Sequence, residues 1–194
     1  MDIVRPKPRQ HVPEDAKKVF SGVLYGVYQW EQERFDGSSA TYERLEREDS
    51  VVIIPVTEQG TILIGREQQP GTDWYLTVPC GGIEPGEAPE AAAKRELLEE
   101  TGYAPVELDF WFAHQVESRV DWAIFVFIAR GCKRVSDQQV DSGERIEVSE
   151  VSFDDFLRVA TKDEFQNMNI APKLLKAALD PEEMVALKKR LGLS

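Results

Sequence analysis

The sequence predicts an α/β protein in which helices cover a mixed sheet, with an additional antiparallel β extension at the N-terminus. Three observations support this fold class. Strand-like runs dominate residues 20–153, one helical segment interrupts them at 89–100, and the last 40 residues are helical in pattern. A mixed sheet with helices on its faces is the simplest way to bury such elements. At 194 residues the chain is long enough to form its own hydrophobic core.

Composition places the chain among globular proteins and argues against two kinds of partner. Hydrophobic residues make up 42% and charged residues 30% of the chain, as in folded domains. The 35 acidic residues outnumber the 23 basic ones, which gives a net charge of -12. Such a surface repels nucleic-acid phosphates and anionic lipids, so we expect no nucleic acid and no membrane as partners. Without a long apolar run or a signal-peptide core, a cytoplasmic location is expected.

The cysteines and histidines restrict which metals the chain can bind. Cys80 and Cys132 follow neither disulfide nor zinc spacing, and only His11 and His114 could add imidazole ligands. Any bound metal is therefore expected to be held by oxygen. His114 lies in an apolar strand and is predicted to be a satisfied core histidine. Cys80 is predicted to be a small buried side chain rather than a nucleophile.

The N-terminal part of the chain is predicted to contain an arm and a β extension. Residues 1–18 are polar and punctuated by prolines, which predicts a flexible arm. Residues 20–35 and 40–46 are rich in strand-forming side chains and flank the turn sequence at 35–38, which predicts a hairpin. Exposed hairpin edges are unfavourable alone, so we expect residues 19–48 to be buried in a homodimer.

The middle of the chain is predicted to contain the central strands and the first helix. Residues 51–56 and 61–64 are continuous apolar runs around a turn, which predicts a hairpin buried on both faces. A proline in the first turn, alanines within and Gly102 just beyond predict a helix over 89–100. Further strands are predicted at 75–78, 106–116, 121–129 and 146–153, and further helices at 154–161, 171–179 and 182–191.

Three acidic residues of the first predicted helix suggest a metal site. Glu96, Glu99 and Glu100 are related by steps of three and four residues and are expected to share one face. At ~6 Å and an effective dielectric of about 20, each pair repels by roughly 3 kcal/mol, more than a surface ion pair returns. A hard dication such as Mg²⁺ or Mn²⁺ would compensate, and Arg95 could orient one carboxylate. The alternative is a solvated acidic face.

The surrounding residues favour the metal site. Residues 81–87 read GGIEPGE and are followed, after seven residues, by RELLEETGY at 95–103. This pattern resembles the Nudix box, which is a glycine, five residues, a glutamate, seven residues and REUXEEXGU, with U apolar. Every fixed position is filled, and seven such matches arise by chance in about one of 10⁸ starting positions. Only Tyr103 departs, because an aliphatic side chain is commoner there.

The resemblance implies the Nudix fold, an α/β/α sandwich, and hydrolysis of a nucleoside diphosphate linked to another group X. It implies four metal ligands and assigns catalytic roles to two of them and to Arg95. Glu87 and Gly102 are implied as supporting residues. The implied ligands are the Gly81 carbonyl, Glu96, Glu99 and Glu100, of which Glu96 and Glu100 are also catalytic. The predicted organisation is an arm at 1–18, the extension at 19–48, the Nudix domain at 49–180 and a C-terminal helix at 181–194.

Four less specific features resemble the ADP-ribose pyrophosphatase-like branch of the family. They are the N-terminal hairpin, VPCGG at 78–82, GERIEV at 143–148 and the late helices. In that branch a loop glutamate before the IEV strand helps to deprotonate the attacking water, which implies Glu144 as the base, with Asp141 in reserve. An ordinary exposed loop acid is the alternative for Glu144.

Substrate contacts are implied by analogy with the branch. Tyr25, Trp30 and Tyr42 could stack on a base, although packing between strand aromatics is the alternative for each. Trp74 could line the mouth of the site, and ordinary packing within its loop is the alternative. Arg66 and Arg119 could face a phosphate or a terminal ribose.

The sequence also departs from the branch, which leaves the substrate open. EQQ stands at 67–69 where QYR is common, HQVES at 114–118 where a Ser-Pro-Gly loop is usual, and Thr77 where glutamate is frequent. The expected function is Mg²⁺-dependent hydrolysis of nucleoside diphosphate sugars, ADP-ribose-like, to a nucleoside monophosphate and a sugar phosphate. The alternatives are another Nudix substrate (a dinucleoside polyphosphate, NADH or coenzyme A) and a non-catalytic nucleotide-sugar sensor.

Overall fold

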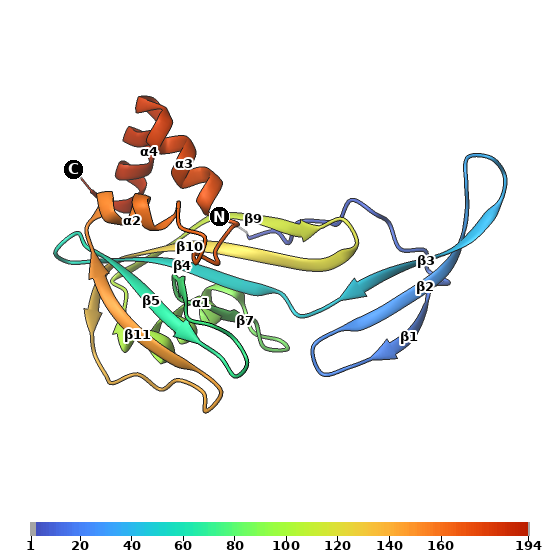
Figure 1. Ribbon diagram of the computed structural model, residues 1–194, viewed down its shortest axis with the longest axis horizontal. Coiled ribbons are helices and arrows are strands. Elements are labelled where there is room, and N and C mark those ends of the chain that lie inside the picture. The colour runs from blue at the N-terminus through green and yellow to red at the C-terminus, as the bar shows by residue number, and fades with distance from the viewer. Residues whose placement is uncertain (1–2, 194) are drawn as a thin grey trace.

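The computed structural model describes residues 3–193 (Figure 1). Its strands form one connected mixed sheet whose longest path runs β1-β2-β3-β10-β4-β5-β11. The strands are β1 (Lys17–Ser21), β2 (Gly26–Glu33), β3 (Ser39–Glu46), β4 (Ser50–Thr57), β5 (Ile62–Gln68), β6 (Tyr75–Thr77), β7 (Cys80–Gly82), β8 (Tyr103–Ala104), β9 (Glu107–Glu117), β10 (Val120–Arg134) and β11 (Arg145–Val151). The helices are α1 (Pro89–Thr101), α2 (Phe153–Val159), α3 (Ala171–Leu179) and α4 (Pro181–Leu191).

The central strand β4 is buried along its whole length because both faces of the sheet are covered. Val51 and Ile53 pack on one face against Leu97 and its alanine neighbours in α1. Val52 and Ile54 pack on the other face, in the cluster that includes the apolar side chains of α2, α3 and α4. This arrangement confirms the predicted α/β class, with α1 and the late helices on opposite faces of a mixed sheet.

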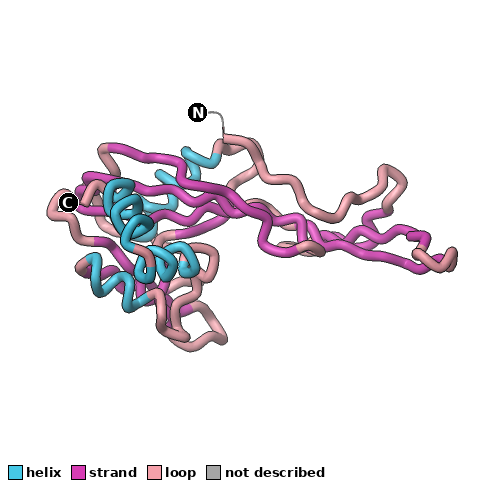
Figure 2. Tube along the Cα trace, turned by 90° about the horizontal axis from the view of Figure 1, so that it is seen from above, coloured by secondary structure: helices cyan, strands magenta, loops and turns pink. Residues whose placement is uncertain are grey.

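The position of β10 explains how the extension joins the core. This strand pairs antiparallel with β9 and parallel with β4. Its first residues also pair parallel with the end of β3, at Val120 to Leu45 and Asp121 to Glu46. The ribbon of β1, β2 and β3 therefore continues the sheet and projects away from the helices (Figures 1 and 2).

The N-terminal arm differs from the prediction. Residues 3–16 lack helix and strand, as expected, but they are docked rather than loose. Arg5 donates to Asp49 (2.7 and 2.9 Å) and to Asp121 (2.7 Å), and the Pro6 carbonyl accepts from Gln115 at 2.8 Å. Arginine in forked contact with carboxylates is a strong anchor, and a polar, aperiodic segment gives no sequence signal of such long-range partners.

The other differences concern element boundaries. The strand predicted at 20–35 is two strands, β1 and β2, because the chain reverses between Ser21 and Gly26. The strand predicted to end at 153 stops at Val151, because the Ser152 hydroxyl caps α2 by accepting from the Asp155 backbone N–H at 3.1 Å. Within residues 3–193, no helix is long and apolar enough to cross a membrane.

Candidate active site

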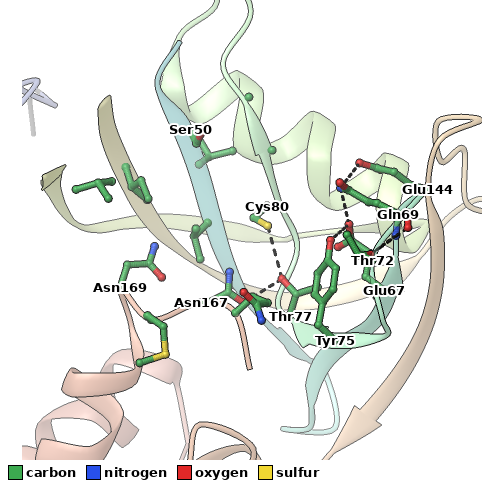
Figure 3. A pocket seen from close by; sticks show the side chains of 18 of the residues that line it. Ser50, Glu67, Gln69, Thr72, Tyr75, Thr77, Cys80, Glu144, Asn167 and Asn169 are labelled. Atoms are coloured by element: carbon green, nitrogen blue, oxygen red, sulfur yellow. Dashed lines mark hydrogen bonds between the residues drawn. The ribbon is translucent and has the colours of Figure 1, made fainter. Parts of the chain in front are cut away.

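A cavity of about 1000 Å³ opens on the sheet face that carries Val52 and Ile124. The paired residues Gly82, Ser50, Ile124 and His114 cross this face in one row over β7, β4, β10 and β9, and all four line the cavity. The segment between α2 and α3 forms the part of the wall that contains Asn169 (Figure 3). The side chains of Lys, Arg, His, Asp and Glu that line it are Arg47, Glu67, Asp73, His114, Glu144, Asp163 and Glu164.

Glu100 lies in the last turn of α1 and is almost completely buried, with 7% of its surface exposed. Its Oε2 accepts from the Cys80 backbone N–H at 3.2 Å, so α1 reaches β7 through this carboxyl. Burial, followed by repulsion from Glu96 and Glu67, raises the pKa of Glu100 well above its ordinary value. A carboxyl held in this way favours a cation beside it.

Arg95 holds the other two glutamates of the helix. Its Nη1 donates to Glu96 at 2.7 Å and to Glu99 at 3.2 Å. The rest of the guanidinium donates to both carboxylate oxygens of Glu87 (3.0 and 2.9 Å) and to the Gly82 carbonyl (2.8 Å). These bonds tie α1 to the glycine-containing loop and hold the pKa of Glu87 below its usual value.

Glu99 lies at the exposed edge of the acidic face that was predicted on α1. Its side chain is 41% exposed and shares Arg95 Nη1 with Glu96, whose pKa its charge helps to raise. Glu96 in turn repels the buried Glu100. Glu99 and Glu100 are consecutive, and consecutive residues project about 100° apart around a helix with 3.6 residues per turn. Among residues 3–193, no three His, Cys, Asp or Glu side chains form a ready-made metal site.

A second acidic pair faces these helical glutamates. Glu67 of β5 is buried, and its Oε1 accepts from the Tyr75 hydroxyl and from Gln69 Nε2 (3.0 Å). The same Gln69 nitrogen donates to Glu144 Oε1 at 3.2 Å, so one amide joins the two carboxyls (Figure 3). Glu67 and Glu144 both contribute to the raised pKa of Glu100. Four carboxyls, from α1, β5 and the segment before β11, therefore interact, and two of them, Glu67 and Glu144, line the cavity.

Glu67 was missed by the sequence-based analysis, although a signal for it exists. Arg66 is exposed, so alternation along β5 turns Glu67 to the buried side. A glutamate at an inward position of a core strand is rarely buried without a role.

The comparison with known proteins identifies the family. The model of the NUDIX domain matches residues 46–174. The chain belongs to the Nudix family. It is 28% identical over 174 residues to an ADP-ribose pyrophosphatase of Bacillus subtilis (strain 168), covering 86% of this chain and 94% of that protein. It is 25% identical over 146 residues to a methanol dehydrogenase activator of Bacillus methanolicus, covering 74% of this chain and 79% of that protein.

A solved structure shows the same fold. The crystal structure of an ADP compounds hydrolase matches with a TM-score of 0.72 and 22% identity, over 93% of this chain and 98% of that chain. The predicted Nudix fold and the resemblance to the ADP-ribose pyrophosphatase branch are confirmed. The protein is a Nudix pyrophosphohydrolase.

The residues of the Nudix box fit a hard dication. The implied ligands are all carboxylate or carbonyl oxygens, which Mg²⁺ and Mn²⁺ prefer. A methyl group at Gly81 would overlap the Glu96 carboxylate, so this glycine keeps the carboxyl directly against β7. Burial raises the pKa values of Glu96, Glu100 and Glu144, and a nearby cation would relieve that cost. Gly102 ends α1 in the left-handed conformation (φ 76°), with its N–H donating to Leu98.

The aromatic residues predicted to contact a base are not gathered at the cavity within one chain. Trp30 is 5% exposed and packs against Tyr42 in the extension, and neither lines the cavity described by residues 3–193. Trp74 does line it, beneath the Arg66 guanidinium at 4.4 Å. Arg66 itself pairs with Glu147 at 3.1 Å outside the cavity wall. Arg119 lies at the turn before β10, where its carbonyl accepts from Leu45.

Arg47 is a cavity residue that the sequence-based analysis did not single out. It is the one Lys or Arg side chain among the described lining residues. Its guanidinium lies 4.1 Å from the Trp122 ring centroid and 5.6 Å from that of Tyr25, and its buried Nε has no hydrogen-bond partner. A stacked guanidinium with free donors suits a phosphate or the polar edge of a base. Tyr25 thus approaches the cavity only through Arg47.

His114 is not the satisfied core histidine that was predicted. It is half-buried in the cavity wall beside Phe112, and its buried Nδ1 has no hydrogen-bond partner. Burial, followed by repulsion from Lys173, lowers its pKa, so the ring is neutral near pH 7. Burial raises the pKa of both thiols, that of Cys132 to about 12, in agreement with an unreactive Cys80.

Neighbouring glycines allow a test of the close contact between β7 and α1. We expect Gly81→Ala to displace the Glu96 carboxylate and to lower kcat/KM at least about tenfold more than Gly82→Ala does. A methyl group at Gly82 meets no atom within 4 Å, which makes it the matched control. Because the displaced group is the end of a flexible side chain, both variants should melt within a few degrees of the wild type. Equal kcat/KM values for the two variants would contradict this role of Gly81.

The lowered pKa of His114 predicts a pH dependence of stability. The unfolded chain takes up this proton near pH 6.5 and the folded protein only at lower pH. The contribution of His114 to stability is therefore highest above pH 6.5 and is lost as the pH drops toward the folded pKa. His114→Gln removes this contribution, so urea denaturation should show a smaller loss of stability between pH 7 and pH 5 in the variant. Identical losses in the two proteins would be inconsistent with a destabilised imidazolium.

Proposed function

We propose that this Nudix enzyme hydrolyses the diphosphate linkage of ADP-sugars, ADP-ribose-like substrates preferred, to AMP and a sugar phosphate with Mg²⁺ as cofactor. The observation that supports it most is the lining of the cavity. Two of the four interacting carboxyls, Glu67 and Glu144, line it, and so does Arg47, the one guanidinium among the described lining residues, which stacks on the Trp122 ring. The Bacillus subtilis relative, named as an ADP-ribose pyrophosphatase, supports the substrate class.

Each group has a definite task in this proposal. Glu96, Glu100 and the Gly81 carbonyl would hold a dication, with Glu99 at the exposed rim. When bound, the ion supplies charge neutralisation for the diphosphate and a lowered pKa for the attacking water. Glu144 accepts the proton of that water, and Arg95 keeps Glu96 in place. Arg47 pairs with the nucleotide end of the substrate.

A hydrolysis screen with product identification tests the proposal. Purified protein with Mg²⁺ is offered ADP-ribose, other ADP-sugars, UDP- and GDP-sugars, dinucleoside polyphosphates, NADH and coenzyme A. We expect the highest kcat/KM for an ADP-sugar, with AMP and a sugar phosphate as products. Preference for a polyphosphate, NADH or coenzyme A would replace this substrate class. Binding of ADP-ribose without release of products, with either Mg²⁺ or Mn²⁺, would favour a sensor.

We also propose that the protein is a homodimer through its β extension. The ribbon of β1, β2 and the turn between them exposes several large apolar side chains. They are Val19, Phe20, Val23 and Leu24. Apolar groups clustered on a projecting ribbon are typical of an interface. Sedimentation equilibrium should give twice the mass of the chain, and a monomer at micromolar concentrations would refute the dimer.

A further inference from the structure

Asn167 belongs to a loop, yet it is buried in the cavity wall with only 7% of its surface exposed. The loop follows α2 and is held to β6 by two backbone bonds, from Leu76 to Glu164 (2.8 Å) and from Gln166 to Leu76 (2.9 Å). The side chain of Asn167 then reaches the start of the glycine loop. Its Oδ1 accepts from the Val78 backbone N–H at 2.7 Å and from the Thr77 hydroxyl at 3.0 Å.

These two bonds fix which way the amide points. A backbone N–H can only donate, so the atom facing Val78 must be the oxygen of the Asn167 side chain. The amide nitrogen therefore points away from the Val78 N–H and toward the Cys80 thiol, a weak acceptor whose pKa this hydrogen bond lowers. Since Asn167 lines the cavity, this nitrogen borders it (Figure 3). A side-chain amide nitrogen carries two donor hydrogens, so one remains for a bound ligand beside the weak contact with the thiol.

The surroundings of this donor are polar and contain no cation. Cys80, the neutral His114 and two acidic residues of the same loop, Asp163 and Glu164, line the cavity, and the buried His114 Nδ1 has no partner. The Thr77 hydroxyl is already engaged by Val78 and Asn167 within the protein. Asn169 repeats the arrangement, because its Oδ1 accepts from the Ile170 backbone N–H at 3.0 Å. No lysine or arginine other than Arg47 lines the described wall. A phosphate would need a cation, whereas neutral donors and acceptors match the hydroxyl groups of a sugar.

We propose that Asn167 determines specificity by donating a hydrogen bond to a hydroxyl oxygen of the sugar in the X position of the substrate. The proposal rests on the proposed function, which supplies the diphosphate. Asn167 lies between the Glu67 and Glu144 end of the cavity and Asn169 (Figure 3), so the sugar would continue from the diphosphate along this cation-free wall. The base would lie toward the aromatic rings beside Arg47.

The test compares two substrates in each variant. ADP-ribose and the β-methyl ester of ADP share adenosine and diphosphate, but only the first carries a hydroxylated X group. In the wild type we expect kcat/KM for ADP-ribose to exceed that for the methyl ester by about tenfold or more. Asn167→Ala should bring this ratio close to one. The ratio of the two kcat/KM values is first measured on the wild-type protein, so this test does not depend on whether a variant folds. A wild-type ratio near one would already overturn the proposal.

A matched variant separates recognition from anchoring of the loop. Thr77→Val removes one of the two donors to Asn167 Oδ1 but leaves the amide nitrogen in place, so the substrate ratio should stay at its wild-type value. If Asn167→Ala slows both substrates equally, the residue is only an anchor and the proposal is wrong. Suppose that Asn167→Ala changes the preference between ADP- and UDP-sugars but leaves the ratio of kcat/KM for ADP-ribose and the methyl ester unchanged. Asn167 would then contact the base, and the proposal would also be refuted. If the wild type hydrolyses neither substrate, the proposed function fails instead.

Discussion

Glu100→Gln is expected to lower kcat at least about 100-fold while leaving the fold intact. Changing residues that merely support metal ligands costs 10- to 100-fold, and Glu100 is proposed as a ligand itself. Glutamine keeps the acceptor for the Cys80 N–H but removes a carboxyl that is buried beside Glu96 and Glu67. Eliminating a buried, repelled charge costs no stability. The melting temperature should therefore equal or exceed that of the wild type.

The response to Mg²⁺ makes this prediction specific to the site. A ligand that binds only the folded protein stabilises it in proportion to RT ln(1 + [L]/Kd), so wild-type protein should melt at a higher temperature when Mg²⁺ is added. The shift should be strongly reduced in Glu100→Gln. Glu90→Gln is the matched control, because Glu90 is exposed in the first turn of the same helix. Normal turnover in Glu100→Gln, or equal Mg²⁺ shifts in the two variants, would remove Glu100 from the metal site.

Local patterns predicted those parts of the fold that depend on neighbouring residues. The apolar run of β4 predicts burial on both faces of the sheet, and in the structure both faces are covered. The proline at the start of α1 and Gly102 beyond its end predicted both ends of that helix to within one residue. The glycine-loop and helix residues of the candidate site could be predicted for the same reason, because they all fall within 23 consecutive residues, 81–103.

Residues that depend on contacts between distant segments were not predictable in this way. Asn167 bonds to Val78, 89 positions away, from a loop without any periodic pattern. Arg5 reaches Asp121 over 116 positions. Arg47 enters the cavity because β10 pairs with β3 and β4 and places Trp122 beneath its guanidinium. Sequence spacing is informative on a single helix or strand, whereas these side chains meet only through sheet topology.

Glu144→Gln is expected to lower kcat by about 10²- to 10⁴-fold, the usual contribution of a general base. Glu144 lines the cavity and is joined through Gln69 to the buried Glu67. Burial, followed by repulsion from Glu67 and Asp141, raises its pKa. A base must be deprotonated to act, so the wild-type kcat should rise with pH through a midpoint above the ordinary glutamate value of about 4.3. The variant should lack this rise.

The Mg²⁺-induced thermal shift distinguishes a base from a metal ligand. It should persist in Glu144→Gln, because this side chain belongs to the segment before β11 and not to α1. Asp141→Asn is the control, since Asp141 is exposed and touches Glu144 only through its carbonyl, which accepts the Glu144 backbone N–H at 3.0 Å. Loss of turnover in Asp141→Asn with normal rates in Glu144→Gln would identify Asp141, and not Glu144, as the proton acceptor. Loss of the thermal shift in Glu144→Gln would instead make Glu144 a metal ligand. The proton acceptor would then be expected to be Glu67 or Glu96, the other carboxyls that interact with Glu100.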